Sequence, residues 1–68
     1  MNDRELVRRL RRYARRREVN FEYSSRRGKG SHGRIRLGEY WTTVPRGEIP
    51  TGTLAAMLRD LRVDRRDL

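Results

Sequence analysis

Hydrophobic side chains recur along the chain at two different spacings, and each spacing predicts a different kind of element. Near the N-terminus the apolar positions fall on one stripe of a helix, with arginines filling most of the remaining surface. Asn2 followed three residues later by Glu5 is close to a capping box, so we expect a helix over about residues 3–16. Its apolar stripe consists of Leu6, Val7, Leu10, Tyr13 and Ala14.

Strict alternation of apolar and polar residues then predicts three strands. The first covers residues 19–23, and the second runs from Gly33 to Leu37. Gly38-Glu39 suits a two-residue type II′ hairpin turn, which leads into a third strand, Tyr40 to Val44. We expect Val19, Phe21, Tyr23, Ile35 and Leu37 to line the inner face of the sheet.

Helical spacing returns near the C-terminus, where Leu54, Met57, Leu58 and Leu61 recur at i, i+3, i+4 and i+7. Thr51 or Thr53 is a candidate cap for this helix. The polar residues after Val63 are expected to fray. The order α-β-β-β-α predicts a single α+β domain over residues 1–68, with a three-stranded antiparallel sheet and two helices on one face.

The charge of the chain is large and uneven. Eighteen basic and nine acidic residues give a net charge of +9, and all of that excess lies in residues 1–36. A polyanionic partner is therefore expected. The sequence has no cysteine, which excludes disulfides and thiolate zinc sites, and it has one histidine. No apolar run reaches the roughly 20 residues of a membrane span. We expect a cytoplasmic protein without cofactors.

The segment from Arg26 to Gly33, R-R-G-K-G-S-H-G, holds the most informative chemistry. Glycines let backbone amides approach a phosphate, and cationic side chains supply charge. Histidine, with a pKa of about 6.5, serves as acid or base near neutral pH. We predict phosphate binding by Arg27, Lys29, Gly30, Ser31, Arg34 and Arg36, with His32 as the catalytic candidate. A surface or structural role for His32 is the alternative.

Three motifs carry a family resemblance: G-K-G-S-H at 28–32, T-V-P at 43–45 and G-T-L-A-A-M-L at 52–58. Together they resemble the HicA, or YcfA-like, family of mRNA interferase toxins over about residues 4–63. The resemblance implies a double-stranded-RNA-binding-domain-like fold and a catalytic role for His32. It also implies a type II toxin–antitoxin system, metal-independent endoribonuclease activity on mRNA, and inhibition by a HicB-type antitoxin protein.

The chain departs from the family pattern in two places. Many members have a second histidine directly after Gly-Ser-His, or soon after Val-Pro, where this chain has Gly33 and Arg46. The proton donor for the leaving 5′-oxygen is therefore left open between water, Tyr40 and Lys29. A non-catalytic RNA-binding or interaction module on the same scaffold is the alternative function.

Three further readings stay open at this stage. The arginines of the first helix are solvated, bind RNA or, least favoured, lie on a membrane surface. Trp41 either packs in the core or at an edge of the sheet or, if it faces outward with Thr43, is available as a base-stacking platform. Glu22 pairs with Arg34 or Arg36, or orients His32. If strand pairing begins at residue 32, then His32, Arg34 and Arg36 project together from the open face.

Overall fold

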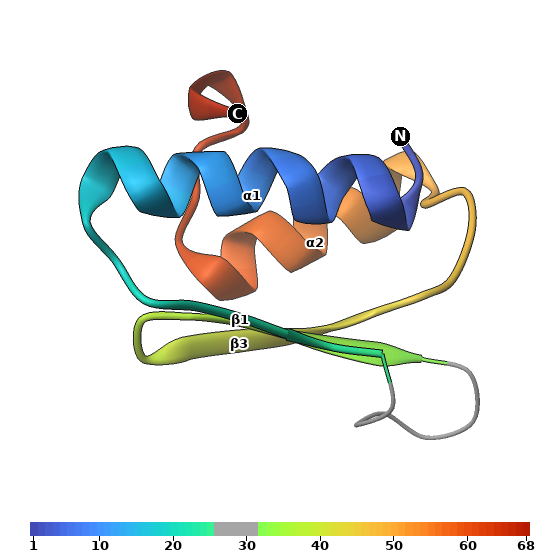
Figure 1. Cartoon of the computed structure of the whole chain (residues 1–68). Helices are drawn as coiled ribbons and strands as arrows, with labels where there is room; N and C mark the ends of the chain where they lie inside the picture. Colours follow the sequence, from blue (N-terminus) through green and yellow to red (C-terminus); the bar gives the residue numbers. More distant parts are fainter. Residues whose placement is uncertain (26–31) are drawn as a thin grey trace.

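A computed structural model of the chain describes residues 1–25 and 32–68 and has the predicted order α-β-β-β-α (Figure 1). The antiparallel sheet has the strand order β1-β2-β3. Both helices lie on the same side of the sheet, which confirms the predicted fold class (Figure 1). The elements are α1 (Asp3–Arg17), β1 (Phe21–Ser24), β2 (Gly33–Leu37), β3 (Tyr40–Val44), α2 (Thr51–Leu61) and the short 3-10 helix η1 (Arg65–Asp67).

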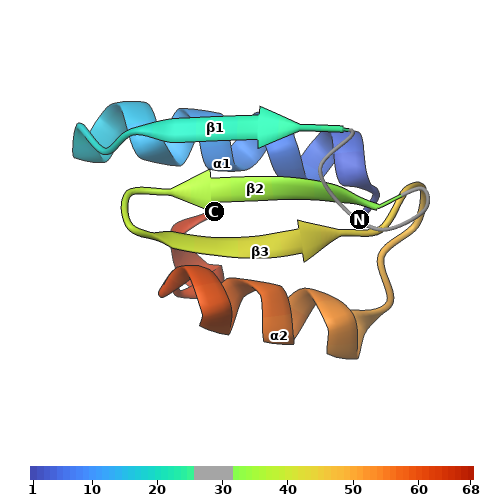
Figure 2. The same cartoon turned by 90° about the horizontal axis from the view of Figure 1, so that it is seen from below.

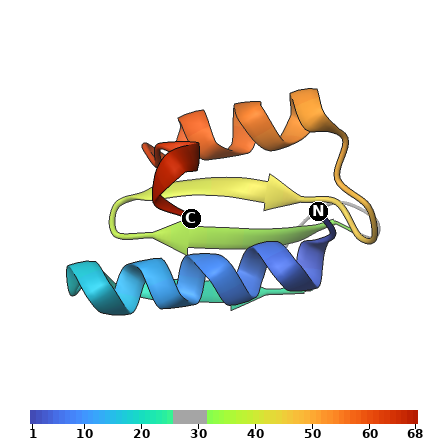
Figure 3. The ribbon, with the colours of Figure 1, turned by 90° about the horizontal axis from the view of Figure 1, so that it is seen from above.

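The hydrophobic core fills the space between the two helices and the inner face of the sheet. Its largest fully buried side chains come from every layer: Leu6 and Leu10 from α1, Ile35 from β2, Val44 from β3 and Leu61 from α2. Figure 3 shows α1 lying over β1 and α2 lying on the β3 side. This arrangement leaves the opposite face of the sheet without a helix (Figure 2).

The helix α1 begins with the predicted Asn2 cap, and the way it ends shows why the predicted inward position of Val19 is wrong. The Asn2 side chain accepts a hydrogen bond of 2.8 Å from the backbone N–H of Glu5. At the other end Glu18 adopts a left-handed conformation, and the N–H of Val19 donates to the carbonyl of Ala14. Val19 therefore completes the helix cap and is 36% exposed, rather than lining the inner face of β1.

The hairpin between β2 and β3 is confirmed. Leu37 pairs with Tyr40, so Gly38 and Glu39 form a two-residue connection. Gly38 has a φ of +62°, whereas Glu39 does not have a positive φ, and this combination fits a type II′ turn. Of the remaining predicted inner residues, Ile35 and Leu37 are buried, and Phe21 and Tyr23 are partly buried against the core.

The predicted threonine cap of α2 is wrong. Pro50 occupies the N-cap position and provides no side-chain hydrogen bond, while Thr51 already lies in the first turn. The helix instead begins with the N–H of Leu54 donating to the carbonyl of Pro50 at 2.9 Å. Thr51, Gly52 and Thr53 are exposed, so water can satisfy the N–H groups of this first turn in place of a side-chain cap.

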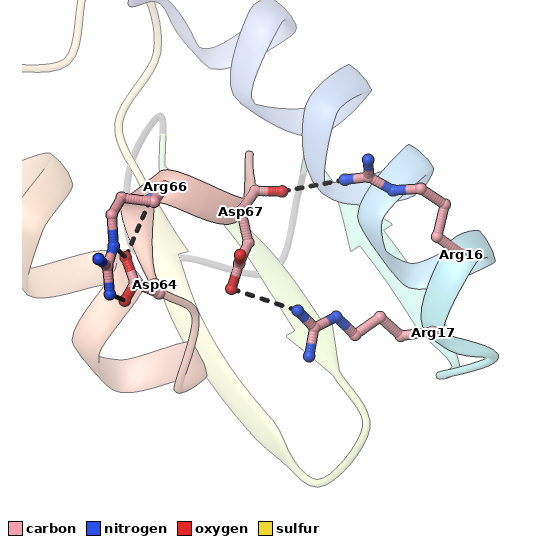
Figure 4. A network of polar contacts seen from close by, with 5 residues as sticks. All are labelled: Arg16, Arg17, Asp64, Arg66 and Asp67. Atoms are coloured by element: carbon pink, nitrogen blue, oxygen red, sulfur yellow. Dashed lines mark hydrogen bonds and ion pairs between the residues drawn. The ribbon is translucent and has the colours of Figure 1, made fainter.

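The C-terminal residues are held in place, contrary to the expectation that they fray. Asp64 caps η1 by accepting a hydrogen bond of 2.9 Å from the backbone N–H of Arg66. Asp67 then joins η1 to α1 in two ways, because its carbonyl accepts from Arg16 at 2.9 Å and its carboxylate pairs with Arg17 at 3.2 Å (Figure 4). This network neutralises part of the charge of α1.

Any side chain larger than that of glycine is expected to destabilise the fold at position 33. A Cβ at this position would lie 2.8 Å from the carbonyl oxygen of Ser24, a backbone atom that cannot move without disturbing β1. We predict that Gly33→Ala destabilises the fold by about 1–3 kcal/mol, the usual range for an overpacked site. The melting temperature, followed by circular dichroism, should fall by about 4–8 °C for each kcal/mol.

Gly52→Ala is the matched control for Gly33→Ala. Gly52 lies in α2, and a Cβ there would meet nothing within 4 Å. Alanine is the better helix former, so this variant should melt at or above the temperature of the parent. Equal melting temperatures for Gly33→Ala and the parent would show that β1 and β2 do not pack as described.

Acid should weaken the N-terminal half of α1. The hydrogen bond from Arg9 holds the pKa of Glu5 below its ordinary value, and the charges of neighbouring arginines add to that effect. A carboxyl whose pKa is lowered by folding stabilises the native state above its unfolded pKa, and this contribution is lost as the pH falls through the folded pKa.

The test is the melting temperature of Glu5→Gln relative to the parent at pH 7 and at about pH 3. The variant should melt below the parent at pH 7, and the gap should close in acid. Glu39→Gln is the control, because Glu39 has no ion pair within residues 1–25 and 32–68. A gap that widens in acid would contradict the assigned role of Glu5.

Candidate functional site

His32 is exposed and lies at a corner of the fold, directly before β2. Because Gly33 pairs with Val44, His32 lies beside the end of β3 and close to Pro45. Strand pairing thus begins one residue after His32. His32 is expected to project with Arg34 and Arg36 only if strand pairing begins at residue 32, and the pairing begins at Gly33 instead.

A shallow groove runs from His32 along the line where β3 meets α2, with a volume of about 370 Å³. Thr43 contributes to it from the sheet, while Thr53 and Asp60 contribute from the helix. The Thr42 hydroxyl donates to the carboxylate of Asp60 at 3.0 Å. A chain lying in this groove would meet hydroxyl groups and one carboxylate beside an imidazole. The full lining is His32, Thr42, Thr43, Pro45, Pro50, Thr53, Ala56, Met57 and Asp60.

Arg34 and Arg36 lie on the open face of the sheet and line a different depression from His32. Their neighbours Ile35 and Leu37 are buried, so the alternation places the two arginines on the side away from the helices. Trp41 shares this face, because Thr42 and Val44 are the buried residues of β3. Of the two orientations considered for Trp41, the structure has the outward one.

The other four predicted phosphate-binding residues lie outside the described residues. These are Arg27, Lys29, Gly30 and Ser31. The structure therefore separates the described part of the predicted site into two places, with His32 at the groove beside α2 and Arg34 and Arg36 on the open face of the sheet.

The register rules out two roles considered for residues at the far end of the sheet. Tyr40 pairs with Leu37, four residues along the strand from the Gly33–Val44 pair beside His32. At about 3.3 Å per residue this separation is roughly 13 Å, which is too far for Tyr40 to protonate the leaving group of a phosphate held by His32. Glu22 lies opposite Arg36 in the β1–β2 register, three residues along the strand from Gly33 or roughly 10 Å, so it does not orient His32.

Asp60 and Arg46 are two polar residues near His32 that sequence reasoning did not assign to the site. Asp60 lies on the side of α2 that borders β3, but its exposure gives a helical pattern no means of distinguishing it from a solvated carboxylate. Arg46 stands one residue after the T-V-P motif, and its guanidinium donates to the carbonyl of Ser25 at 3.3 Å. It thereby ties the end of β3 to the end of β1, next to the start of the glycine-rich segment.

A second depression lies along α1 and carries much of the positive charge. It has a volume of about 520 Å³, and its apolar floor is made by Val7 and Tyr23. Five arginines border it, at positions 4, 8, 11, 12 and 15. Of these only Arg8 has an acidic partner, Glu5, within residues 1–25 and 32–68. Four of the five arginines that border this groove therefore carry charge without an acidic partner among the described residues.

The rest of the described chain adds two observations. Residues 1–25 and 32–68 contain no group of three or more His, Asp or Glu side chains placed to hold a metal ion. Within the same residues, neither helix has the length and apolar character needed to cross a membrane.

Comparison with known proteins adds no relative. The sequence matches no family model, no curated protein and no solved structure. The resemblance to the HicA family therefore stays a hypothesis drawn from the three motifs.

Proposed function

We propose that this protein is a metal-independent endoribonuclease of the HicA toxin type, acting on mRNA in the cytoplasm. The observation that carries the proposal is the place of its only histidine. His32 is exposed, follows the Gly-Lys-Gly-Ser segment directly, and borders a groove whose lining combines three threonines with apolar residues and the carboxylate of Asp60. The arginines of α1 and of the open sheet face supply the positive charge that an RNA substrate requires.

In the proposed reaction His32 takes the proton from a ribose 2′-hydroxyl. The 2′-oxygen then attacks the adjacent phosphorus, and the bond from phosphorus to the 5′-oxygen breaks. The products are a 2′,3′-cyclic phosphate and, once the leaving oxygen has gained a proton, a 5′-hydroxyl. The described lining of the His32 groove holds no cationic side chain, so Arg27 and Lys29, close to His32 in the sequence, are the residues proposed to stabilise the additional negative charge of the crowded intermediate. Water or Lys29 supplies the proton to the leaving oxygen.

An acidic antitoxin of the HicB type is the proposed protein partner. Such a partner would neutralise the cationic half of the chain and cover His32, which favours fast and tight association. The arginine-bordered groove along α1 is large enough to take several carboxylates and presents an apolar floor for their neighbours.

A non-catalytic RNA-binding module is the second candidate, favoured by one specific observation. Trp41 is 51% exposed on the open face of the sheet, where a large aromatic side chain does not contribute to the core. The experiment that separates the two candidates is incubation of the purified protein with a long single-stranded RNA in EDTA. Cleavage supports the nuclease, whereas intact RNA bound to a folded protein supports the binding module.

A further inference from the structure

Arg34 and Trp41 form a stacked pair on the open face of the sheet. They come from neighbouring strands, with Arg34 paired to Thr43 and Trp41 two residues before Thr43 on the same face. The guanidinium carbon of Arg34 lies over the indole ring, 4.0 Å from its centroid. Arginine and tryptophan are the side chains that most readily stack on nucleobases.

Core packing does not account for the position of this pair. Both helices lie on the other side of the sheet (Figure 2), and the burial pattern of β3 places Trp41 on the open side, where it borders a depression shared with Asp60 and Arg62. Trp41 remains 51% exposed and is the most exposed large hydrophobic residue of the described chain. An exposed indole stacked with a guanidinium offers the flat aromatic surface on which nucleobases stack in proteins that bind single strands.

Positive charge extends from this pair to α1. The depression on the open face is lined by Arg34 and Arg36 together with Glu22, Tyr23 and Ser24, so two cations outnumber one carboxylate there. Tyr23 of the edge strand β1 also lines the arginine-bordered groove along α1, and it is the residue that the two depressions share. The C-terminal Asp67 partners the arginines at 16 and 17 and none of those bordering this groove, of which only Arg8 has an acidic partner within residues 1–25 and 32–68.

We propose that the open face of the sheet binds single-stranded RNA, with one base stacked against the Trp41–Arg34 pair. The sugar–phosphate backbone then follows the arginines across the edge of β1 toward α1. Only unpaired bases offer a free face to an aromatic ring, so a duplex would not use this platform. The choice of RNA as ligand rests on the proposed function, whereas the platform itself is independent of His32.

The test uses the only tryptophan of the chain as its own reporter. The probe is a single-stranded ten-nucleotide 2′-O-methyl RNA of mixed sequence, which lacks the 2′-hydroxyl proton and is not cleaved. We expect it to quench the fluorescence of Trp41. Fluorescence anisotropy of a dye-labelled copy should show that Trp41→Leu weakens binding by about 5- to 150-fold, the usual effect of losing one stacked base. Arg34→Lys, which keeps the charge and loses the planar stack, should weaken it less.

The chain offers a matched control away from this face. Arg17 stacks over Tyr13 with its guanidinium carbon 4.8 Å from the ring centroid, and neither residue lines the depressions that hold Trp41, Arg34 or the groove arginines of α1. Arg17→Lys should therefore bind the probe as the parent does. A loss of binding in this variant equal to that in Arg34→Lys would overturn the platform.

Other results also overturn it. The fluorescence of Trp41 staying unchanged while the single strand is bound would be one such result. Equal binding and quenching by a perfectly paired duplex would be a second. Quenching by a polyglutamate peptide to the same extent as by the RNA would be a third, and it would make the face a protein-binding surface. Failure of the platform is distinguishable from failure of the nuclease. If Trp41→Leu cleaves unmodified RNA as fast as the parent, the nuclease proposal stands and the platform proposal fails. If the probe quenches Trp41 but the parent does not cleave RNA, the platform proposal stands and the nuclease proposal fails.

Discussion

Replacement of His32 by alanine is expected to abolish cleavage of RNA while leaving its binding nearly intact. Acid–base catalysis by a positioned side chain contributes about 100- to 10,000-fold to a rate, and His32 is the only histidine of the chain. The side chain is exposed at the corner before β2, so its loss creates no cavity in the core. RNA affinity should change by no more than about two- to threefold, as for other exposed positions.

The measurement is the initial cleavage rate of a single-stranded RNA, together with the dissociation constant for the uncleavable 2′-O-methyl probe. Glu39→Ala is the control, since Glu39 is exposed in the hairpin at the opposite end of the sheet. It should cleave like the parent. An undiminished rate in folded His32→Ala would remove His32 from the chemistry and with it the proposed mechanism.

Among the substitutions proposed for this protein, replacement of Leu10 by alanine should lower the free energy of unfolding the most. Leu10 lies in the middle of α1, is 0% exposed, and packs into the core between α1 and the sheet. Truncation of such a residue costs about 2–5 kcal/mol. A domain of this size is stabilised by only about 3–10 kcal/mol in total. The melting temperature should fall by at least about 10 °C, or the cooperative transition should vanish.

Arg12→Ala controls for the substitution itself. Arg12 lies on the exposed face of the same helix, half a turn from Leu10, and alanine is the better helix former. Its melting temperature should stay close to that of the parent. A Leu10→Ala variant that melted within about 3 °C of the parent would mean that α1 does not cover the sheet as described.

Much of the fold follows from the sequence because hydrophobic spacing decides it. The helical stripe from Leu6 to Ala14 and the alternation around Ile35 each identify an element and its buried face. Element ends are harder, because they depend on single backbone conformations. The left-handed residue Glu18 moves Val19 from strand to helix cap. The contacts of Asp67 with α1 order a terminus whose own sequence is polar throughout.

The candidate site was less predictable, because it depends on how the elements are placed against each other. Spacing alone left both faces of β3 open for Trp41, and only the pairing of the strands shows it beside Arg34. The same pairing separates Tyr40 from His32 by most of the length of the sheet. Asp60 enters the groove of His32 through the packing of α2 against β3, which no local pattern encodes.

The chemistry of the RNA ends tests the central claim most directly. The purified protein would be incubated with a long single-stranded RNA in EDTA, beside folded His32→Ala, and the termini of any fragments identified. The proposed mechanism predicts 2′,3′-cyclic phosphate and 5′-hydroxyl ends from the parent, and none from the variant. Intact RNA with the folded parent, or fragments with 5′-phosphate ends from attack by water, would contradict it.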